Sequence, residues 1–289
     1  MREVKYSEIT NHVAQLCQEA NFNIGDDVIL ALQKAITSEN SPIAIDVLNQ
    51  IIENARIARE ECVPMCQDCG VAVFFIEIGQ DVHVIGGDIN EAINEGVRIG
   101  YSKGYLRKSM VASPLRRVNT GDNTPPVVHF KIVPGDKIRI VCAPKGAGSE
   151  NMSKLKMLKP SDGIVGVKKF VIAEIKKAGG NPCPPSVIGI GIGGGADLAL
   201  YLGKKALIRP VGERHKDKKI AAFELDLIKQ INKSGIGPMG LGGKTTVLDV
   251  HVEKAHRHPA SLPVGLIVQC WANRRATARI YANGKVEYL

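Results

Sequence analysis

Three of the chain's seven cysteines fall within eight residues, in the stretch CVPMCQDCG at residues 62–70. Thiolates bind metal ions or act as nucleophiles, and the neighbouring amide of Gln67 and carboxylate of Asp68 can hold a polar substrate. An apolar run rich in β-branched and aromatic residues follows at 71–78 and predicts a buried strand. The sequence therefore predicts a chemically active loop that is held in place by a rigid strand.

The spacing of these cysteines allows more than one metal site. Cys62, Cys66 and Cys69 match the CxxxCxxC spacing of radical S-adenosylmethionine enzymes, in which three thiolates hold an iron-sulfur cluster. Against that match, Asp68 stands where those enzymes usually have an aromatic residue, and the regular strand–helix alternation of their barrel is absent from the sequence. Zinc is less favoured, because His83 is the only histidine within twenty residues of the loop.

Two further cysteines stand in segments with a marked backbone character. Cys183 lies among three prolines in NPCPP, residues 181–185, which predicts a stiff, extended segment. Cys270 ends an apolar run at 266–270 that predicts a strand. Taken one at a time, both thiols are expected to be small, buried and inert.

Two glycine-rich stretches are similar to nucleotide-binding motifs but differ from them in detail. Residues 189–194 fit GxGxxG after a strand, yet the acidic residue about 20 positions further on, Glu213, falls in a charged loop. A close crossing of a strand and a helix is the favoured interpretation. Gly243-Lys244-Thr245 lacks the glycine that a phosphate-binding loop needs five positions earlier, where Pro238 stands. That stretch is expected to be an ordinary loop that lines a site.

Several longer motifs are spread along nearly the whole chain. They are CQD with a following glycine at 66–70, KGxGS at 145–149, CPP at 183–185, GPxGxGG at 237–243, HPAS at 258–261 and LPVG at 262–265. Together they resemble the motifs of the class I fumarases and L-tartrate dehydratases, a family of iron-sulfur hydro-lyases. The resemblance implies that Cys66, Cys183 and Cys270 bind a 4Fe-4S cluster. Cys69 departs from the family, in which threonine is common at this position.

The same resemblance implies roles for five further residues. Gln67 and Asp68 are expected beside the cluster as catalytic and substrate-binding residues. Arg107 is expected to clamp a substrate carboxylate, for which its forked guanidinium is well suited. Gly146 is expected to lend backbone amides to the same anion, and His258 is expected to face the substrate.

The implied reaction is the reversible hydration of fumarate to L-malate, with the cluster as the Lewis acid. Dehydration of L-tartrate to oxaloacetate is the alternative within the family, and a radical S-adenosylmethionine enzyme is the alternative outside it. Single-chain members carry a second half with a threonine base, whereas this chain stops at Leu289. The resemblance therefore implies an α subunit that needs a β subunit to complete the active site for a small dicarboxylate substrate. An α2β2 assembly is expected.

Composition places the chain among ordinary globular proteins. It has 289 residues, of which 44% are hydrophobic and 23% charged. No apolar run approaches the roughly 20 residues of a membrane helix, and the N-terminus lacks the apolar core of a signal peptide, so we expect no membrane and a cytoplasmic location. The net charge of +9 comes with only 4% aromatic residues, which favours attraction of a small dianion over binding of nucleic acid.

The elements that must position these residues follow from periodicity and capping. Residues 1–60 are predicted to form a helical lead-in and residues 61–289 a mixed α/β part that binds the cluster, in one domain of class α/β (mixed α+β) over residues 1–289. Asp88 is predicted to cap a helix at 89–103. Other predicted helices cover residues 8–20, 26–37, 41–59, 162–178 and 220–233. Predicted hairpins join 127–133 to 137–143 and close the tail at 281–288.

Overall fold

The structure, a computed structural model, describes residues 2–281 and 283–289. Contacts divide the chain into two compact units, each of which is described by itself. The first unit contains the chain up to Ile24 together with Asn54–Gly146 and Arg274–Leu289, and the second contains Gly25–Glu53 and Ala147–Asn273.

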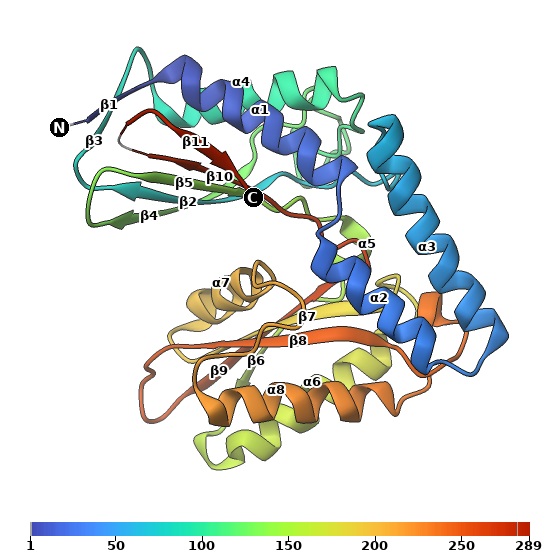
Figure 1. Cartoon of the computed structure of the whole chain (residues 1–289). Coiled ribbons are helices and arrows are strands. Elements are labelled where there is room, and N and C mark those ends of the chain that lie inside the picture. The colour runs from blue at the N-terminus through green and yellow to red at the C-terminus, as the bar shows by residue number, and fades with distance from the viewer. Residues whose placement is uncertain (1, 282) are drawn as a thin grey trace. The chain divides into compact units, whose positions relative to one another are not determined.

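The first unit is built on a five-stranded mixed sheet with the strand order β11-β10-β5-β2-β4 (Figure 1). Its strands are β2 (Val73–Gly79), β4 (Val127–Val133), β5 (Ile138–Cys142), β10 (Ala276–Ile280) and β11 (Val286–Tyr288). A parallel pair, β1 (Arg2–Lys5) and β3 (Val82–Ile85), forms a separate small sheet. Helices α1 (Tyr6–Phe22) and α4 (Ile89–Lys103) pack on one face of the five-stranded sheet and share one apolar core with it.

Both helices form for the reasons that the sequence indicates. The predicted apolar stripe of α1 is fully buried: Val13, Leu16, Cys17 and Ala20. Asp88 caps α4, because its carboxylate accepts hydrogen bonds from the backbone N–H groups of Asn90 and Glu91. These contacts fix the layer that covers the sheet.

The predicted hairpin of residues 127–133 and 137–143 is wrong. Strands β4 and β5 form there, but β2 lies between them, parallel to β4 and antiparallel to β5. Four successive residues of β2 are buried, which suits a central strand with partners on both sides. The turn at 134–136 therefore connects two strands that flank a third one, and a local turn signal cannot reveal a strand inserted from elsewhere in the chain.

The predicted tail hairpin is confirmed in its described part. Strands β10 and β11 pair antiparallel, with Ile280 opposite Val286, and the N–H of Tyr281 donates to the carbonyl of Lys285 at 2.9 Å. Residue 282, which belongs to the predicted hairpin, lies outside the described residues.

The second unit is built on a four-stranded mixed sheet with the order β6-β9-β7-β8. Its strands are β6 (Lys154–Leu158), β7 (Ser186–Ile192), β8 (Val247–Lys254) and β9 (Leu262–Gln269). Helices α6 (Gly163–Ala178) and α8 (Lys218–Asn232) lie on one face, and α7 (Ala196–Ala206) lies on the other (Figure 1). The unit also contains α2 (Asp26–Ser38), α5 (Ala147–Glu150), the first part of α3 (Pro42–Glu61) and 3₁₀ turns at Pro160–Asp162 and Pro238–Gly240.

The glycines of the GxGxxG stretch serve helix packing, as predicted. A Cβ atom at Gly189 would lie 2.0 Å from the carbonyl oxygen of Gly203, and one at Gly191 would lie 2.0 Å from that of Ala199. Helix α7 therefore crosses β7 at a distance that only glycine permits.

The mixed α/β class is confirmed by these two sheets and their helices. The predicted lead-in forms as α1, α2 and α3, but residues up to 24 belong to the first unit and residues 25–53 to the second. That the chain is one domain over residues 1–289 stays a prediction. Among the residues that the structure describes, no helix is long and apolar enough to cross a membrane.

Candidate functional site

The cysteine loop of the first unit is pressed against a second backbone segment. Gly70 has φ +75°, and a Cβ atom there would lie 2.6 Å from the carbonyl carbon of Lys145. Val71 donates to the carbonyl of Lys145 at 3.1 Å, and the N–H of Lys145 donates back at 2.9 Å. This short two-way pairing explains why the glycine of the CQD motif is needed, and it brings the KGxGS segment to the loop.

The carboxylate of Asp68 has a defined position within this contact. Its Oδ1 accepts hydrogen bonds from the N–H of Gly70 at 3.0 Å and from the hydroxyl of Ser109 at 3.3 Å. Its Oδ2 lies only 3.2 Å from where a Cβ on Gly146 would stand. Asp68 and Gly146, two predicted site residues, are therefore in direct proximity.

A buried arginine, Arg274, was not among the predicted site residues, and it holds the cysteine loop by a hydrogen bond to its backbone. Arg274 is 2% exposed, and its Nη1 donates to Oδ1 of Asn21 at 3.0 Å and to the backbone carbonyl of Asp68 at 2.9 Å. Among the described residues, none accepts a hydrogen bond from its Nε. Arginines seldom lie this deep in a protein, so the sequence alone gave no reason to expect a buried arginine four residues after Cys270.

Cys66 is half-buried and lies among polar groups. Its Sγ is 3.3 Å from Oε1 of Gln67 and 3.4 Å from the backbone nitrogen of Asp68, which donates to it. Gln67 itself is exposed. A thiol in this setting is accessible to a metal or a cluster.

Cys69 is in a different setting from Cys66. It is 1% exposed, and its Sγ accepts a hydrogen bond from the backbone N–H of Arg107 at 3.1 Å. Burial raises the pKa of the Cys69 thiol, so it stays protonated near neutral pH. Cys62, by contrast, is exposed. The three thiols of the CxxxCxxC spacing therefore do not share one surface, which gives the radical-enzyme alternative no support.

Cys183, in the second unit, stands in a turn and not in the predicted extended segment. Its φ is +53°, and its N–H donates to the carbonyl of Gly180 at 3.0 Å. Its own carbonyl accepts from the N–H of Trp271 at 3.2 Å. Hydrogen bonds at both ends hold the residue in a conformation that the flanking prolines disfavour, and they leave its side chain exposed.

The same contact brings Cys183 and Cys270 to one end of the sheet. Strand β7 begins just after Cys183, β9 ends just before Cys270, and the two strands are antiparallel with Val187 opposite Gln269. The glycine-rich loop at 237–243 reaches this end as well, since the N–H of Met239 donates to the carbonyl of Pro184 at 2.7 Å. Two predicted ligands and one motif are therefore gathered here.

His258 lies at the opposite end of β9. It belongs to the connection from β8 to β9, and the eight residues of β9 separate that end from Cys270 by about 25 Å. The imidazole is exposed, and its Nδ1 accepts a hydrogen bond from the N–H of Ala260 at 3.1 Å. The second unit thus does not bring His258 together with Cys183 and Cys270.

The predicted site is divided between the two units. The first holds Cys66, Gln67, Asp68, Arg107 and Gly146, and the second holds Cys183, Cys270 and His258. Within the described parts of the chain, no three His, Cys, Asp or Glu side chains are grouped to hold a metal ion.

Comparison with known proteins identifies the family. The family model described as fumarate hydratase (Fumerase) matches residues 10–279.

The chain belongs to this family.

Family members with curated names match over nearly their full length. A protein of Methanocaldococcus jannaschii, whose name L(+)-tartrate dehydratase subunit alpha is itself provisional, is 50% identical over 96% of this chain and 100% of its own. The L(+)-tartrate dehydratase subunit alpha of Escherichia coli strain UTI89 is 35% identical over 98% of this chain and 94% of its own. That of strain K12 is 34% identical over the same shares.

The donor set fits the iron-sulfur cluster that the family resemblance implies. Such clusters take thiolate ligands, and the three family-matching cysteines keep their thiols at or near the surface. The other described cysteines, apart from exposed Cys62, are buried in the core of the first unit: Cys17, Cys69 and Cys142.

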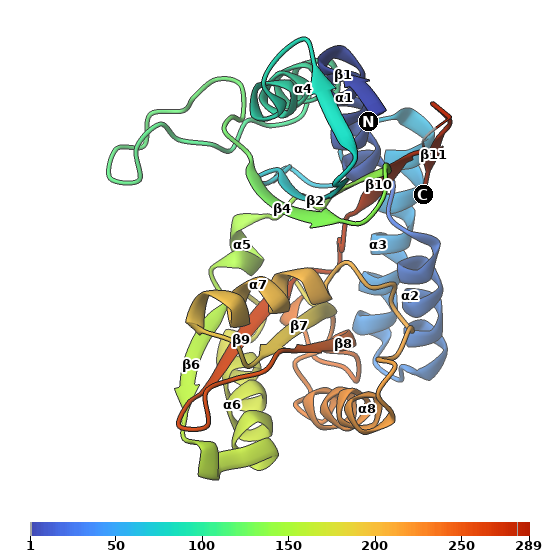
Figure 2. The ribbon, with the colours of Figure 1, turned by 90° about the vertical axis from the view of Figure 1, so that its left-hand side faces the viewer.

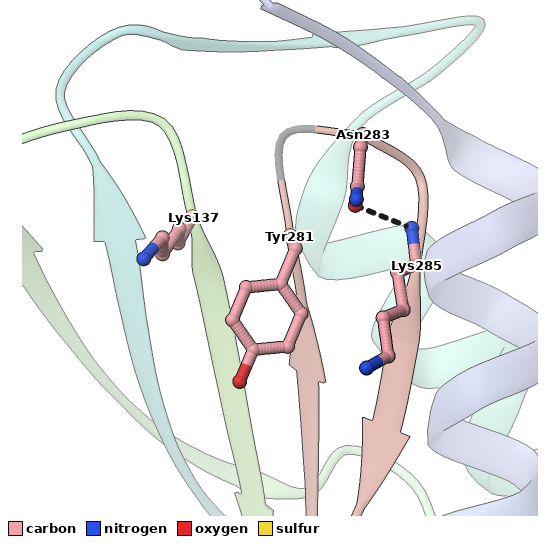
Figure 3. Close-up of a pocket in the computed structure, with 4 residues that line it drawn as sticks. All are labelled: Lys137, Tyr281, Asn283 and Lys285. Carbon is pink, nitrogen blue, oxygen red and sulfur yellow. Dashed lines mark hydrogen bonds between the residues drawn. The ribbon is translucent and has the colours of Figure 1, made fainter.

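The first unit also has a pocket that is lined by two lysines, a tyrosine and an asparagine and by no cysteine. It holds about 480 Å³ and is lined by Lys137, Tyr281, Asn283 and Lys285 (Figure 3). Nζ of Lys137 stands 5.3 Å from the centre of the Tyr281 ring, and Oδ1 of Asn283 accepts from the N–H of Lys285 at 3.0 Å. No predicted site residue is among these four.

Proposed function

We propose that this chain is the α subunit of an iron-sulfur hydro-lyase that adds water to, or removes it from, a four-carbon dicarboxylate. Membership of the fumarate hydratase (Fumerase) family over residues 10–279 supports this function. The observation that carries it is the pair of thiol-bearing loops at one sheet end, in which Trp271 donates to the carbonyl of Cys183 and directly follows Cys270.

The proposed ligands of a 4Fe-4S cluster are Cys66, Cys183 and Cys270. Their side chains are half-buried or exposed, whereas Cys69 is buried and engaged by the N–H of Arg107. These three thiolates would hold the cluster. When bound, the cluster supplies a Lewis acid for the hydroxyl group that leaves or enters.

The chain's own residues bind and orient the substrate. Arg107 is exposed and offers two parallel N–H donors for one carboxylate, and the backbone amides at Gly146 donate to the same group. Asp68 and Gln67 hold the reacting hydroxyl by hydrogen bonds. The hydrogen bonds from Gly70 and Ser109 keep Oδ1 of Asp68 in one orientation, which lowers the cost of ordering the site. The family resemblance implies that His258 binds substrate as well, but its place at the opposite end of β9 from Cys270 gives that role no support within the second unit.

The proton from the neighbouring carbon requires a base, which we assign to a β subunit. The printed names of the relatives, subunit alpha, support a partner of this kind. We propose an α2β2 assembly in the cytoplasm. The family description favours the pair fumarate and L-malate, whereas the relatives' names favour L-tartrate and oxaloacetate, so both pairs have to be assayed.

Iron and sulfide content tests the ligand set directly. After anaerobic reconstitution, Cys66→Ser, Cys183→Ser and Cys270→Ser are each expected to lose most of the bound iron and sulfide. Cys62→Ser is the matched control, because it removes an exposed thiol from the same loop as Cys66, and it is expected to retain the wild-type content. Cys69→Ser, Cys17→Ser and Cys142→Ser are also expected to retain it, if they fold.

The opposite pattern would overturn the assignment. If Cys62→Ser and Cys69→Ser lose the iron while Cys183→Ser and Cys270→Ser keep it, the cluster uses the CxxxCxxC spacing of the radical S-adenosylmethionine enzymes.

A further inference from the structure

The five-stranded sheet of the first unit ends in an edge strand with exposed apolar side chains. Strand β4 is the last strand of the order β11-β10-β5-β2-β4, and it pairs only with β2 within the described residues (Figure 2). Phe130 is 43% exposed and Ile132 is 76% exposed. An open edge of seven residues with exposed apolar side chains is a template for pairing with another strand.

The apolar core between the sheet and helices α1 and α4 covers β2 but only part of β4. Register places Phe130 beside Ile76 of β2, which is only 2% exposed, so both residues lie on the face that α1 and α4 cover. The helices bury Phe74 and Ile76 of β2, whereas on the outer strand Val128 is only partly buried against this core and Phe130 and Ile132 are exposed. The apolar face of the sheet therefore extends onto β4, beyond the part that α1 and α4 cover.

The backbone of β4 presents its outward hydrogen-bonding groups at alternate residues. The N–H of Val127 donates to Ala72, and the carbonyl of Val133 accepts from Gln80, so residues of this parity face β2. In a strand the next residues face the other way. Val128, Phe130 and Ile132 therefore direct their N–H and C=O groups away from the sheet.

We propose that β4 pairs antiparallel with β4 of a second copy of this chain, about a two-fold axis at Phe130. This register overlaps all seven residues, sets Phe130 opposite itself and sets Ile132 opposite Val128. The outward groups of three residues on each strand then form six backbone hydrogen bonds. The two five-stranded sheets join into one.

Charge is compatible with a second copy in this register. The only lysine of β4, Lys131, falls opposite His129 and not opposite itself, so no two fixed positive charges face each other. Each chain carries a net charge of +9, so a register that set Lys131 opposite Lys131 would add repulsion between the two copies. The inference concerns the chain's own sheet and does not rest on the proposed chemistry.

Sedimentation velocity of the full chain, alone and with its co-purified partner, tests the pairing. The chain alone is expected to form dimers with a dissociation constant in the range of about 1–10 μM, as suits a small interface. Phe130→Asp sets two carboxylates opposite each other and is expected to weaken dimerisation at least about tenfold. Phe130→Lys is expected to do the same. A mixture of the two variants is expected to regain the dimer, because each charge then faces its opposite.

The matched control is Met157→Asp on β6. That residue is 54% exposed on an edge strand of the other sheet, so the same change of an apolar residue to a charge should leave the dimer intact. Hydrogen exchange in the wild-type chain needs no substitution. The amides of Val128, Phe130 and Ile132 are expected to gain protection as the protein concentration rises.

Several results would overturn the inference. These are a wild-type chain that stays monomeric, a dimer that survives Phe130→Asp or dissociates with Met157→Asp, and a mixture of the two Phe130 variants that stays monomeric. Protection of these three amides that appears only when the β subunit is added would assign the edge to that partner and would equally reject a second copy.

Discussion

At the scale of single residues, the cysteine loop depends on a buried cation. The guanidinium of Arg274 joins Asn21 of α1 to the backbone of Asp68, and it lies almost wholly out of solvent. A buried charge is retained only where hydrogen bonds compensate its desolvation, and removing it strands the groups that accepted from it. The position of Asp68 therefore depends on a residue more than 200 positions further along the chain.

Replacing this guanidinium should destabilise the chain. Arg274→Met keeps the length of the side chain but leaves the Asn21 amide and the Asp68 carbonyl without their donor, so the free energy of unfolding is expected to fall by about 2–4 kcal/mol. Urea denaturation followed by circular dichroism measures the change. Arg279→Met is the control, since Arg279 is half exposed with a carboxylate 3.8 Å away, and should cost less than about 1 kcal/mol. Equal losses in both variants would contradict the assigned role.

The structure brings some of the predicted site residues together, while their roles stay predictions. Asp68 and Gly146, taken from separate motifs, lie together in the first unit, and Cys183 and Cys270 lie together in the second. Arg274 was missed because its partners come from distant parts of the chain, which no local pattern records. The resemblance implied a substrate contact for His258, and this stays a prediction, although the second unit places His258 far from Cys270.

At the scale of elements, the second unit is organised around close packing of α7 on β7. Gly189 and Gly191 meet the backbone of the helix directly. The sequence favours this crossing over a nucleotide site, because Glu213, the acidic residue that would complete the nucleotide motif, falls in a charged loop. The exchanged strand order around β2 was not predictable in the same way, since hairpin signals describe neighbours in sequence and not strands that insert between them.

Adding one methyl group at the crossing should therefore be costly. Gly191→Ala places a Cβ 2.0 Å from the carbonyl oxygen of Ala199, which is backbone and cannot rotate away, so at least about 3 kcal/mol of stability is expected to be lost. In Gly148→Ala the nearest atom is 3.6 Å away, and the change should stay within about 1 kcal/mol. Thermal and urea unfolding compare the two, and a Gly191→Ala chain as stable as the control would show that the crossing is wrongly placed.

An acidic residue in β8 gives this unit a pH dependence. Burial by itself would raise the pKa of Asp249, but a hydrogen bond and charge from His251, with further donors from Arg214 and the N–H of Gly212, hold that pKa below its ordinary value. The folded state therefore stabilises the charged carboxylate more than the unfolded state does. Its contribution is present above the unfolded value of about 3.9 and is lost as pH falls through the lower folded pKa.

Asp249→Asn should remove this part of the acid sensitivity. The variant is expected to be less stable at pH 7 by about 3 kcal/mol, because Arg214 loses its buried partner, and the deficit should shrink as the pH falls below about 4. Urea denaturation at a series of pH values measures both effects. Asp46→Asn, at an exposed position on α3, is the control and should parallel the wild type. A deficit for Asp249→Asn that is constant across the acid range would exclude the assigned linkage.

At the scale of the whole molecule, family membership was predicted from motifs spread over most of the chain, and the match over residues 10–279 confirms it. The mixed α/β class was likewise predictable, because the periodicities of its helices and buried strands are strong. The division into two units was not, since residues 25–53 join a unit whose remaining residues begin more than 90 positions later. Which unit residues 25–53 join depends on their tertiary contacts, which no local sequence pattern records.

The proposal that this chain is one half of a hydro-lyase is tested most directly by activity with and without a β subunit. The chain is reconstituted anaerobically with iron and sulfide, and hydration of fumarate, followed by its ultraviolet absorbance, is run beside dehydration of L-tartrate. We expect bound iron and sulfide but little or no turnover from the chain alone, and turnover of one of the two substrates once the partner is added. Full activity of the chain by itself, or no activity on either substrate in a cluster-loaded complex, would contradict the account.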